Sequence, residues 1–115
     1  MTDCIFCKIV EGKIPSKKVF ENEHVLAFHD IQPAAPVHVL IIPKIHIHDH
    51  NAWETEHTAV LTELMLAAKE VAKLTGVEQS GYRLLNNCGA DAGQVVFHWH
   101  LHLMGGEGLG PLNSK

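Results

Sequence analysis

The spacing of apolar residues along the chain changes several times, and each spacing predicts a different element. In residues 4–10 the apolar side chains fall at positions 5, 6, 9 and 10, which predicts a short amphipathic helix that ends before Gly12. A longer pattern, with apolar residues three and four positions apart, runs from about Thr55 to Leu74 and ends before Gly76. The sequence therefore predicts one short helix near its start and one long helix in its middle.

Strand patterns fill much of the remaining chain. Segments with these patterns are expected at residues 18–20, 24–29, 37–42, 82–87 and 95–104. The run at 37–42 is mostly β-branched, which predicts a buried central strand that ends at Pro43. No repeat, linker or low-complexity tract divides the chain, so residues 1–115 are expected to form a single domain. This order of elements predicts an α+β fold with a mainly antiparallel sheet.

The most informative segment is the alternating run from Phe97 to Met104, which contains His98, His100 and His102. Alternation with a period of two places the three histidines on one face of a strand. The apolar residues between them, Phe97 included, would lie on the other face, under the long helix. Imidazoles gathered on one face can supply a nucleophile and proton carriers near neutral pH.

Two other interpretations of this run are open. One is a half-exposed strand whose outer positions are histidine by chance, although histidine is not a favoured strand residue. The other is a three-histidine metal site, although successive same-face residues on one strand lie too far apart to converge well on a tetrahedral ion. The pattern favours catalysis over both.

The run from His98 to Met104 fits the signature His-x-His-x-His-x-x with apolar x, and the sequence resembles the histidine-triad (HIT) superfamily. It is most similar to the branch of histidine triad nucleotide-binding proteins that act as purine nucleoside phosphoramidases. Segments that match in order and spacing are residues 4–10, 27–31, 36–44 and 93–94. The resemblance implies a HIT-like fold with a five-stranded sheet, one long helix and a short N-terminal helix. It also implies a homodimer whose sheets join into one, with a purine nucleotide on each protomer.

The resemblance assigns roles to the histidines. His100 would attack the α-phosphorus of AMP linked to an amine or lysine, or of an aminoacyl-adenylate-like compound, and form a nucleotidyl-histidine that water cleaves. His102 would contact the phosphate and handle a proton. His98 has the least defined role in the triad. His38 would lie beside the triad, and the alternative of a buried histidine satisfied by one hydrogen bond stays open.

The rest of the expected nucleotide site comes from two loops and an apolar pocket. Backbone N–H groups of Gly93, Gln94 and Val95 would stabilise phosphoryl oxygens. Asn87 would lie near the phosphate or simply cap the loop that follows it. Asp30 would accept hydrogen bonds from both ribose hydroxyls. The nucleoside pocket is expected to consist of Ile5, Phe6, Ile9, Phe28, His29, Asp30 and Ile31.

Val95 departs from the pattern of some relatives, which place a phosphate-binding serine at this position. Val95 keeps its backbone N–H but has no hydroxyl. The reaction class is expected to stand, whereas rate and substrate detail depend on this difference. Without the resemblance, the apolar residues of the short helix would be ordinary core residues.

Cys4 and Cys7 form a Cys-x-x-Cys pair in a chain with three cysteines, a count that argues against a disulfide framework. Two thiolates and two imidazoles make a common tetrahedral zinc set, and some bacterial members of the superfamily combine these cysteines with the equivalents of His46 and His98. A structural zinc is therefore a candidate cofactor. The alternative is that both cysteines are small buried residues. The neighbouring histidines are expected at the surface: His48, His50 and His57.

Composition and charge limit the partners. Nine Lys and Arg against thirteen Asp and Glu give a net charge of −4, which provides no basic field for nucleic acid. The chain shows neither a membrane-length apolar run nor a signal-peptide layout, so a cytoplasmic protein without an organic cofactor is expected. Three functions stay open: a phosphoramidate hydrolase, a dinucleoside polyphosphate hydrolase or nucleotidyl transferase, and a nucleotide- or zinc-binding adaptor with incidental turnover.

Overall fold

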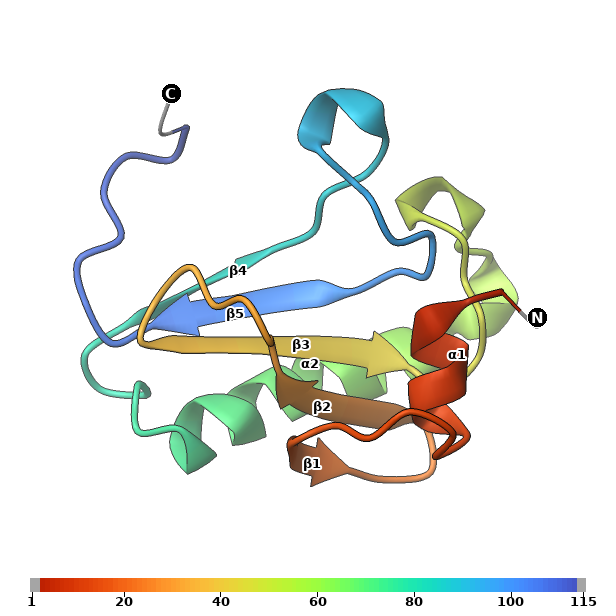
Figure 1. The fold of residues 1–115 in the computed structure, drawn as a ribbon, viewed down its shortest axis with the longest axis horizontal. Helices are drawn as coiled ribbons and strands as arrows, with labels where there is room; N and C mark the ends of the chain where they lie inside the picture. The colour runs from red at the N-terminus through yellow and green to blue at the C-terminus, as the bar shows by residue number, and fades with distance from the viewer. Residues whose placement is uncertain (1–2, 114–115) are drawn as a thin grey trace.

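The computed structural model describes residues 3–113, in which two α-helices accompany five strands (Figure 1). The helices are α1 (Ile5–Val10) and α2 (Thr58–Leu74). The strands are β1 (Lys18–Glu21), β2 (Val25–His29), β3 (Val37–Pro43), β4 (Tyr82–Leu85) and β5 (Leu101–Gly105). The expected α+β class, with one short and one long helix, is confirmed. No helix within these residues has the length and apolar run that a membrane crossing needs.

The strands form one antiparallel sheet in the order β1-β2-β3-β5-β4. β3 lies at the centre, as its buried apolar sequence predicts, and β5 pairs with it although the long helix separates the two in the chain. In this register Leu40 lies opposite His102, and His38 lies opposite Met104. His38 and His102 are therefore diagonal neighbours on one face of adjacent strands.

A different helix covers each face of the sheet. α2 lies behind the sheet in Figure 1, where Val39 and Ile41 of β3 face it within the larger hydrophobic core. The alternate residues Leu40 and Ile42 face the other way and pack with α1 in a second, smaller core. Because α1 is short, it covers one end of its face and leaves the rest open. The candidate site lies on this open face.

The last strand starts later than its alternating pattern predicts. The alternation predicts a strand over residues 95–104, but β5 begins at Leu101. Before that point the chain bends, and the N–H of Trp99 donates to the carbonyl of Ile47 (2.6 Å) instead of to a neighbouring strand. His102 is the only triad histidine within β5, so the prediction of three histidines in one row on a strand face is wrong. They are brought together by the bend as well as by the strand.

Smaller differences from the predicted elements have local causes. Phe97 is 45% exposed and stacks on the exposed ring of His48, so it does not pack under α2 as predicted. β4 ends at Leu85, before the predicted end at residue 87. The helical pattern predicted from residue 55 begins with a short 3-10 turn, and the α-helix itself begins at Thr58.

Candidate active site and metal centre

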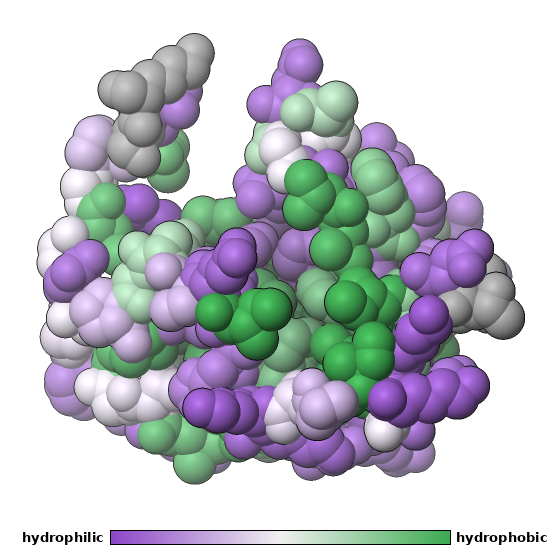
Figure 2. All heavy atoms as spheres, viewed as in Figure 1, coloured by the Kyte–Doolittle hydropathy of each residue, from purple (hydrophilic) through white to green (hydrophobic). Residues whose placement is uncertain are grey.

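A cavity of about 990 Å³ opens on the face of the sheet opposite α2. Figure 2 shows apolar side chains gathered around a hollow on this face. The walls come from α1, the end of β2 and the loop after it, β3, β5 and the bend before β5. Many of the expected site residues line it: Ile5, Phe6, Ile9, Phe28, His29, Asp30, Ile31, His38, Val95, His100 and His102. A concave, largely apolar site with a few polar groups is typical of small-molecule binding.

Backbone contacts fix the proton positions of His38 and His102. The N–H of Ala34 donates to Nδ1 of His38 (2.9 Å), so a neutral His38 carries its proton on Nε2. That Nε2 lies 2.9 Å from Nδ1 of His102 and donates to it. A neutral His102 then carries its proton on Nε2, an atom that is buried and has no hydrogen-bond partner within residues 3–113. His102 therefore has one unused N–H donor on a ring that belongs to the lining of the cavity.

His100 is held in the opposite tautomer. Its Nδ1 lies 2.8 Å from the backbone carbonyl of His98, and since a carbonyl only accepts, Nδ1 carries the proton. Nε2 is left with a free lone pair on a ring that lines the cavity. The side-chain amide of Asn86 donates to the backbone carbonyl of His100 (2.9 Å) and holds this part of the bend in place. The two histidines thus offer one lone pair and one donor.

Burial keeps these imidazoles neutral. Removal from water, together with the neighbouring His100 and His38 rings, lowers the pKa of His102 to about 4. Burial also lowers the pKa of His38 and of His100, and the nearby Asp30 carboxylate opposes the shift in both. The neutral form of His100 is the one that has a lone pair for attack on an electrophile.

Asp30 follows β2 and is oriented by the backbone around it. Its N–H donates to the carbonyl of His38 (2.9 Å), and its Oδ1 accepts from the N–H of Gln32 (2.8 Å). Oδ2 lies 3.5 Å from Nε2 of His38, and the side chain is 20% exposed. Each carboxylate oxygen keeps at least one lone pair for a ligand in the cavity that Asp30 lines.

Phe6 connects α1 to the histidines. Its ring packs edge to face against Phe28, with centroids 5.6 Å apart, and against His100, with centroids 5.1 Å apart. A third edge contact joins it to His98 at 5.9 Å. Each such pair contributes about 0.5–1.5 kcal/mol beyond the burial of its area. Phe6 is therefore a wall of the cavity and a packing partner of two triad histidines.

The four expected metal ligands meet at the N-terminal end of α1: Cys4, Cys7, His46 and His98. Sγ of Cys4 lies 3.3 Å from Nδ1 of His98, and Sγ of Cys7 lies 3.4 Å from Nδ1 of His46. Sγ of Cys7 also lies 3.6 Å from Nδ1 of His98. In a tetrahedral zinc site, bonds of about 2.3 Å to sulfur and 2.05 Å to nitrogen place these atoms about 3.5 Å apart. The geometry fits a zinc ion.

The proton positions also fit a metal. Nε2 of His98 donates to the carbonyl of Pro43 (2.8 Å), so the lone pair of Nδ1 faces the two sulfur atoms. Burial lowers the pKa of His98 to about 4, so the ring is neutral. Cys4 and Cys7 form no disulfide bond, so both sulfur atoms are available as ligands. Two sulfur and two nitrogen donors form a closed structural set, with no position left for substrate.

A second cluster, Asp30, His38 and His102, also brings three ligand-type atoms together. Its proton positions disfavour a metal ion. Nδ1 of His38 already accepts from Ala34, so Nε2 must keep its proton and has no lone pair to offer. The hydrogen bonds thus distinguish the two clusters, and the chemistry of this one is hydrogen bonding.

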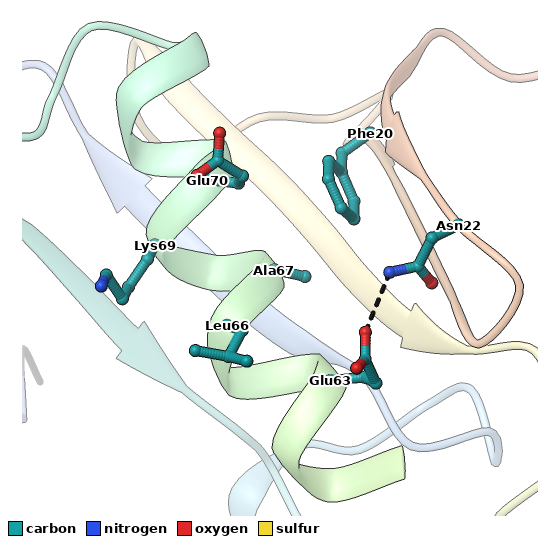
Figure 3. A pocket seen from close by; sticks show the side chains of 7 residues that line it. All are labelled: Phe20, Asn22, Glu63, Leu66, Ala67, Lys69 and Glu70. Atoms are coloured by element: carbon teal, nitrogen blue, oxygen red, sulfur yellow. Dashed lines mark hydrogen bonds between the residues drawn. The ribbon is translucent and has the colours of Figure 1, made fainter. Parts of the chain in front are cut away.

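A smaller hollow of about 180 Å³ lies on the other side of the sheet, between the β1–β2 turn and α2 (Figure 3). Asn22 and Glu63 point toward one another there and form a hydrogen bond of 3.1 Å. None of its lining residues is a histidine or a cysteine. This hollow carries no candidate chemistry.

Comparison with known proteins decides the family. The HIT domain family matches residues 11–109, which is most of the chain. The chain belongs to the HIT family. The resemblance that the histidine motif indicated is thereby confirmed.

Similar proteins support this membership of the HIT family and confirm the fold. The protein is 43% identical over 110 residues to the purine nucleoside phosphoramidase of Escherichia coli K12, which covers 96% of this chain and 92% of the relative. It is 48% identical over 114 residues to an uncharacterized 13.2 kDa HIT-like protein of Azospirillum brasilense, with the same coverage. A HIT family hydrolase from Clostridium thermocellum superposes with a TM-score of 0.93 at 48% identity over 96% of each chain. The HIT-like α+β fold is therefore shown.

In the loop before the histidine triad of this HIT protein, the backbone N–H groups of Gly93 and Gln94 do not point to their expected role. The N–H of Gly93 donates to the carbonyl of Ala90 (3.0 Å), and the N–H of Gln94 donates to the carbonyl of Gly89 (3.1 Å). Both donors are used within the loop, so the structure does not support their predicted contact with phosphoryl oxygens. Neither residue lines the cavity, whereas Val95 does.

The Gln94 side chain has a different function in the loop. Its Oε1 accepts from the N–H of Gly89 (2.8 Å), and its Nε2 donates to the carbonyls of His48 (3.3 Å) and Val96 (3.1 Å). The buried amide thus holds the loop against the segment after β3. Asn87 does not line the cavity either.

Several residues that line the cavity were not among the expected site residues. The cavity is also lined by Pro15, Ser16, Lys17, Pro33, Pro36, Leu40 and Val96. Leu40 was predictable, because alternation along β3 puts it on the face of His38. Asn86, which holds the backbone of His100, carries no such signal. His48 and His50 are exposed as expected, but His57 is half-buried and accepts from the N–H of Glu54 (2.9 Å), capping the turn before α2.

Proposed function

We propose that this HIT protein hydrolyses the P–N bond of purine nucleoside phosphoramidates, with His100 as the nucleophile. The observation that carries the proposal is the hydrogen bond from Nδ1 of His100 to the carbonyl of His98, which leaves the lone pair of Nε2 available at the cavity. The 43% identity to a protein named purine nucleoside phosphoramidase supports the same reaction class.

The reaction proceeds in two steps. The P–N nitrogen takes a proton from solvent, and Nε2 of His100 then attacks the α-phosphorus. The P–N bond breaks, its electron pair leaves with the neutral amine, and a nucleotidyl-histidine forms. Water next attacks the phosphorus, the bonding pair returns to Nε2, and the nucleoside monophosphate departs as one proton goes to solvent. His100 is regenerated in its starting tautomer.

His102 acts in this scheme as a hydrogen-bond donor to a phosphoryl oxygen. Its Nε2–H has no partner within the described residues, and the hydrogen bond from His38 prevents it from turning to the other tautomer. A donor fixed in place before the substrate binds stabilises developing charge without reorganisation. The resemblance gives His102 two roles, contact with the phosphate and transfer of a proton. The position of its proton on Nε2 favours contact with the phosphate. His38 is the positioning residue for His102.

The nucleoside lies in the apolar part of the cavity. Phe6 and the aliphatic side chains of α1 form one wall for the purine, and Phe28 and Ile31 contribute from β2 and the loop after it. Asp30 accepts hydrogen bonds from the 2′ and 3′ hydroxyls through the lone pairs that its backbone contacts leave free. Val95 lines the mouth with an aliphatic side chain that is 83% exposed, and only its backbone N–H can contact the phosphate.

Zinc and a second copy of the chain complete the proposal. Cys4, Cys7, His46 and His98 would hold a structural zinc ion, which supplies no chemistry to the reaction and ties α1 to the sheet. A homodimer with a continuous sheet requires pairing at an edge strand. Of the two edges, β4 carries the exposed side chains of Tyr82 and Leu84, which supports pairing there.

A substrate comparison tests the function. AMP phosphoramidate, AMP linked to lysine, and a dinucleoside polyphosphate are offered to the wild type and to His100→Ala. We expect turnover of the two P–N substrates by the wild type alone, with AMP and amine as products. Faster cleavage of the dinucleoside polyphosphate would point to the neighbouring enzymatic function instead. Equal turnover by wild type and variant would show a binding protein with incidental activity.

A further inference from the structure

His98 belongs to both candidate centres at once. Its ring is a ligand of the metal set, since Nδ1 faces Cys4 at 3.3 Å and Cys7 at 3.6 Å. Its backbone carbonyl accepts the 2.8 Å hydrogen bond from Nδ1 of His100. The ring is completely buried, and its other nitrogen is held by the carbonyl of Pro43 (2.8 Å). His98 thus connects the metal ligands to His100. Nδ1 of its ring faces the two sulfur atoms, and its backbone carbonyl holds Nδ1 of His100.

We propose that the metal set positions the nucleophile: a metal ion bound by Cys4, Cys7, His46 and His98 fixes the peptide of His98, and this peptide selects the reactive tautomer of His100. His98 is then a positioning residue that does not exchange protons with the substrate. The proposal rests on the proposed function in so far as His100 is the nucleophile.

Phe6 provides a second connection. It lies on α1 between Cys4 and Cys7, so any movement of the two sulfur atoms moves its ring. That ring contacts His98 and His100 edge to face. A ring packed against an imidazole restricts its rotation, because cores are close-packed and tolerate little displacement. The metal ligands therefore act on His100 from the helix side as well as from the peptide side.

The short length of α1 makes the metal necessary for this positioning. A six-residue helix is too short to be stable by its own hydrogen bonds. Without an ion, Cys4 and Cys7 are joined to the imidazoles of His46 and His98 only by sulfur–nitrogen hydrogen bonds of 3.3–3.6 Å, which are weak. α1 would then be anchored mainly by Phe6 and Ile9, which are its buried residues.

The tautomer of His100 is the direct readout. Long-range proton–nitrogen correlation spectra distinguish a ring protonated at Nδ1 from one protonated at Nε2, and His100→Gln assigns the signals. We expect a single Nδ1–H tautomer in zinc-loaded wild type. After removal of zinc by a chelator, we expect a mixture of tautomers. We also expect AMP binding to weaken by up to about tenfold, the factor equivalent to one aromatic contact, because Phe6 on α1 forms a wall of the cavity. Added zinc restores both.

Variants separate the metal from general damage. Cys7→Ser should bind little zinc and should show the mixed tautomers, whereas the matched variant Cys88→Ser should behave as the wild type. Cys88 is the third free cysteine and lies outside the metal set. His46→Gln removes a ligand that is not on α1 and serves where Cys7→Ser does not fold. Amide signals of α2, on the far face of the sheet, report whether the fold is retained.

Each outcome decides the proposal. The proposal would be overturned if His100 kept its single tautomer in zinc-free protein. It would also be overturned if the wild type did not bind zinc, or if removal of the metal abolished the amide signals of α2. These readouts need no phosphoramidate. If the tautomer of His100 depends on zinc but the protein does not hydrolyse phosphoramidates, the proposed function is wrong and the positioning role stands. If the protein hydrolyses them but the tautomer does not depend on zinc, the proposed function stands and the positioning role is wrong.

Discussion

The imidazole of His38 donates a hydrogen bond to the imidazole of His102, with 2.9 Å between Nε2 and Nδ1. The N–H of Ala34 fixes the direction of this bond, because it occupies the other nitrogen of His38. A backbone amide outside β5 therefore determines which nitrogen of His102 carries the proton. The proton on Nε2 of His102 is set before any ligand binds.

Substitution of His38 tests this wiring. His38→Leu removes the donor, frees the tautomer of His102, and should lower kcat by about tenfold, the factor equivalent to one net hydrogen bond. His38→Gln keeps an N–H that can reach Nδ1 of His102 and should retain much of the rate. Equal losses in the two variants, measured under saturating AMP phosphoramidate, would show that His38 acts by packing alone.

Acid should destabilise the folded protein through protonation of His102. His102 faces His100, His38 and Asp30, and burial with the two neighbouring rings lowers its pKa to about 4 in the folded state. The unfolded chain, with an ordinary histidine pKa of about 6.5, binds more protons between these values, so stability falls as pH decreases from about 6.5 to 4.

Thermal unfolding across this pH range measures the effect. His102→Asn removes one titrating group and should lose less stability on acidification than the wild type. His48→Asn, a change at an exposed histidine, is the control and should follow the wild-type curve. A His102→Asn curve parallel to that of the wild type would contradict the depressed pKa.

Asp30 is expected to recognise the ribose. Asp30→Ala should weaken binding of AMP by about 1.5–3 kcal/mol, the range for hydrogen bonds to a charged group. Binding of 2′-deoxy-AMP should weaken much less, because one of the two hydroxyl contacts is already missing. Calorimetric titration of both nucleotides gives the comparison, and equal losses would assign Asp30 another role.

Part of this site could be predicted from periodicity and spacing, and most of the remaining site residues were expected only from the resemblance to the HIT family. The buried run from residues 37 to 42 predicted the central strand, and the Cys-x-x-Cys spacing predicted two ligands on one turn. The bend before β5 could not be predicted, because its sequence alternates like a strand while the N–H of Trp99 pairs with the distant Ile47. Proton positions were also out of reach, since they depend on carbonyls and amides that meet only in the fold.

Zinc content is the simplest test of the metal site. Protein purified without a metal-affinity tag should contain about one zinc per chain by elemental analysis. Cys7→Ser should lower both the zinc content and the melting temperature, because bound metal contributes its binding free energy to folding. If the wild type contains no zinc and has the same melting temperature as Cys7→Ser, the two cysteines are packing residues only.

In the proposed reaction, Nε2 of His100 becomes bonded to phosphorus during turnover. Wild-type protein is mixed with excess AMP phosphoramidate, quenched during the first turnover at a pH that preserves phosphorus–nitrogen bonds, and analysed by intact mass and peptide fragmentation. We expect a nucleotidyl adduct that maps to His100, forms before AMP is released, and is absent from His100→Ala although that variant still binds AMP. Turnover by His100→Ala above a tenth of the wild-type rate, a barrier difference below about 1.4 kcal/mol, would show that His100 is not the nucleophile, and so would an adduct on any other residue.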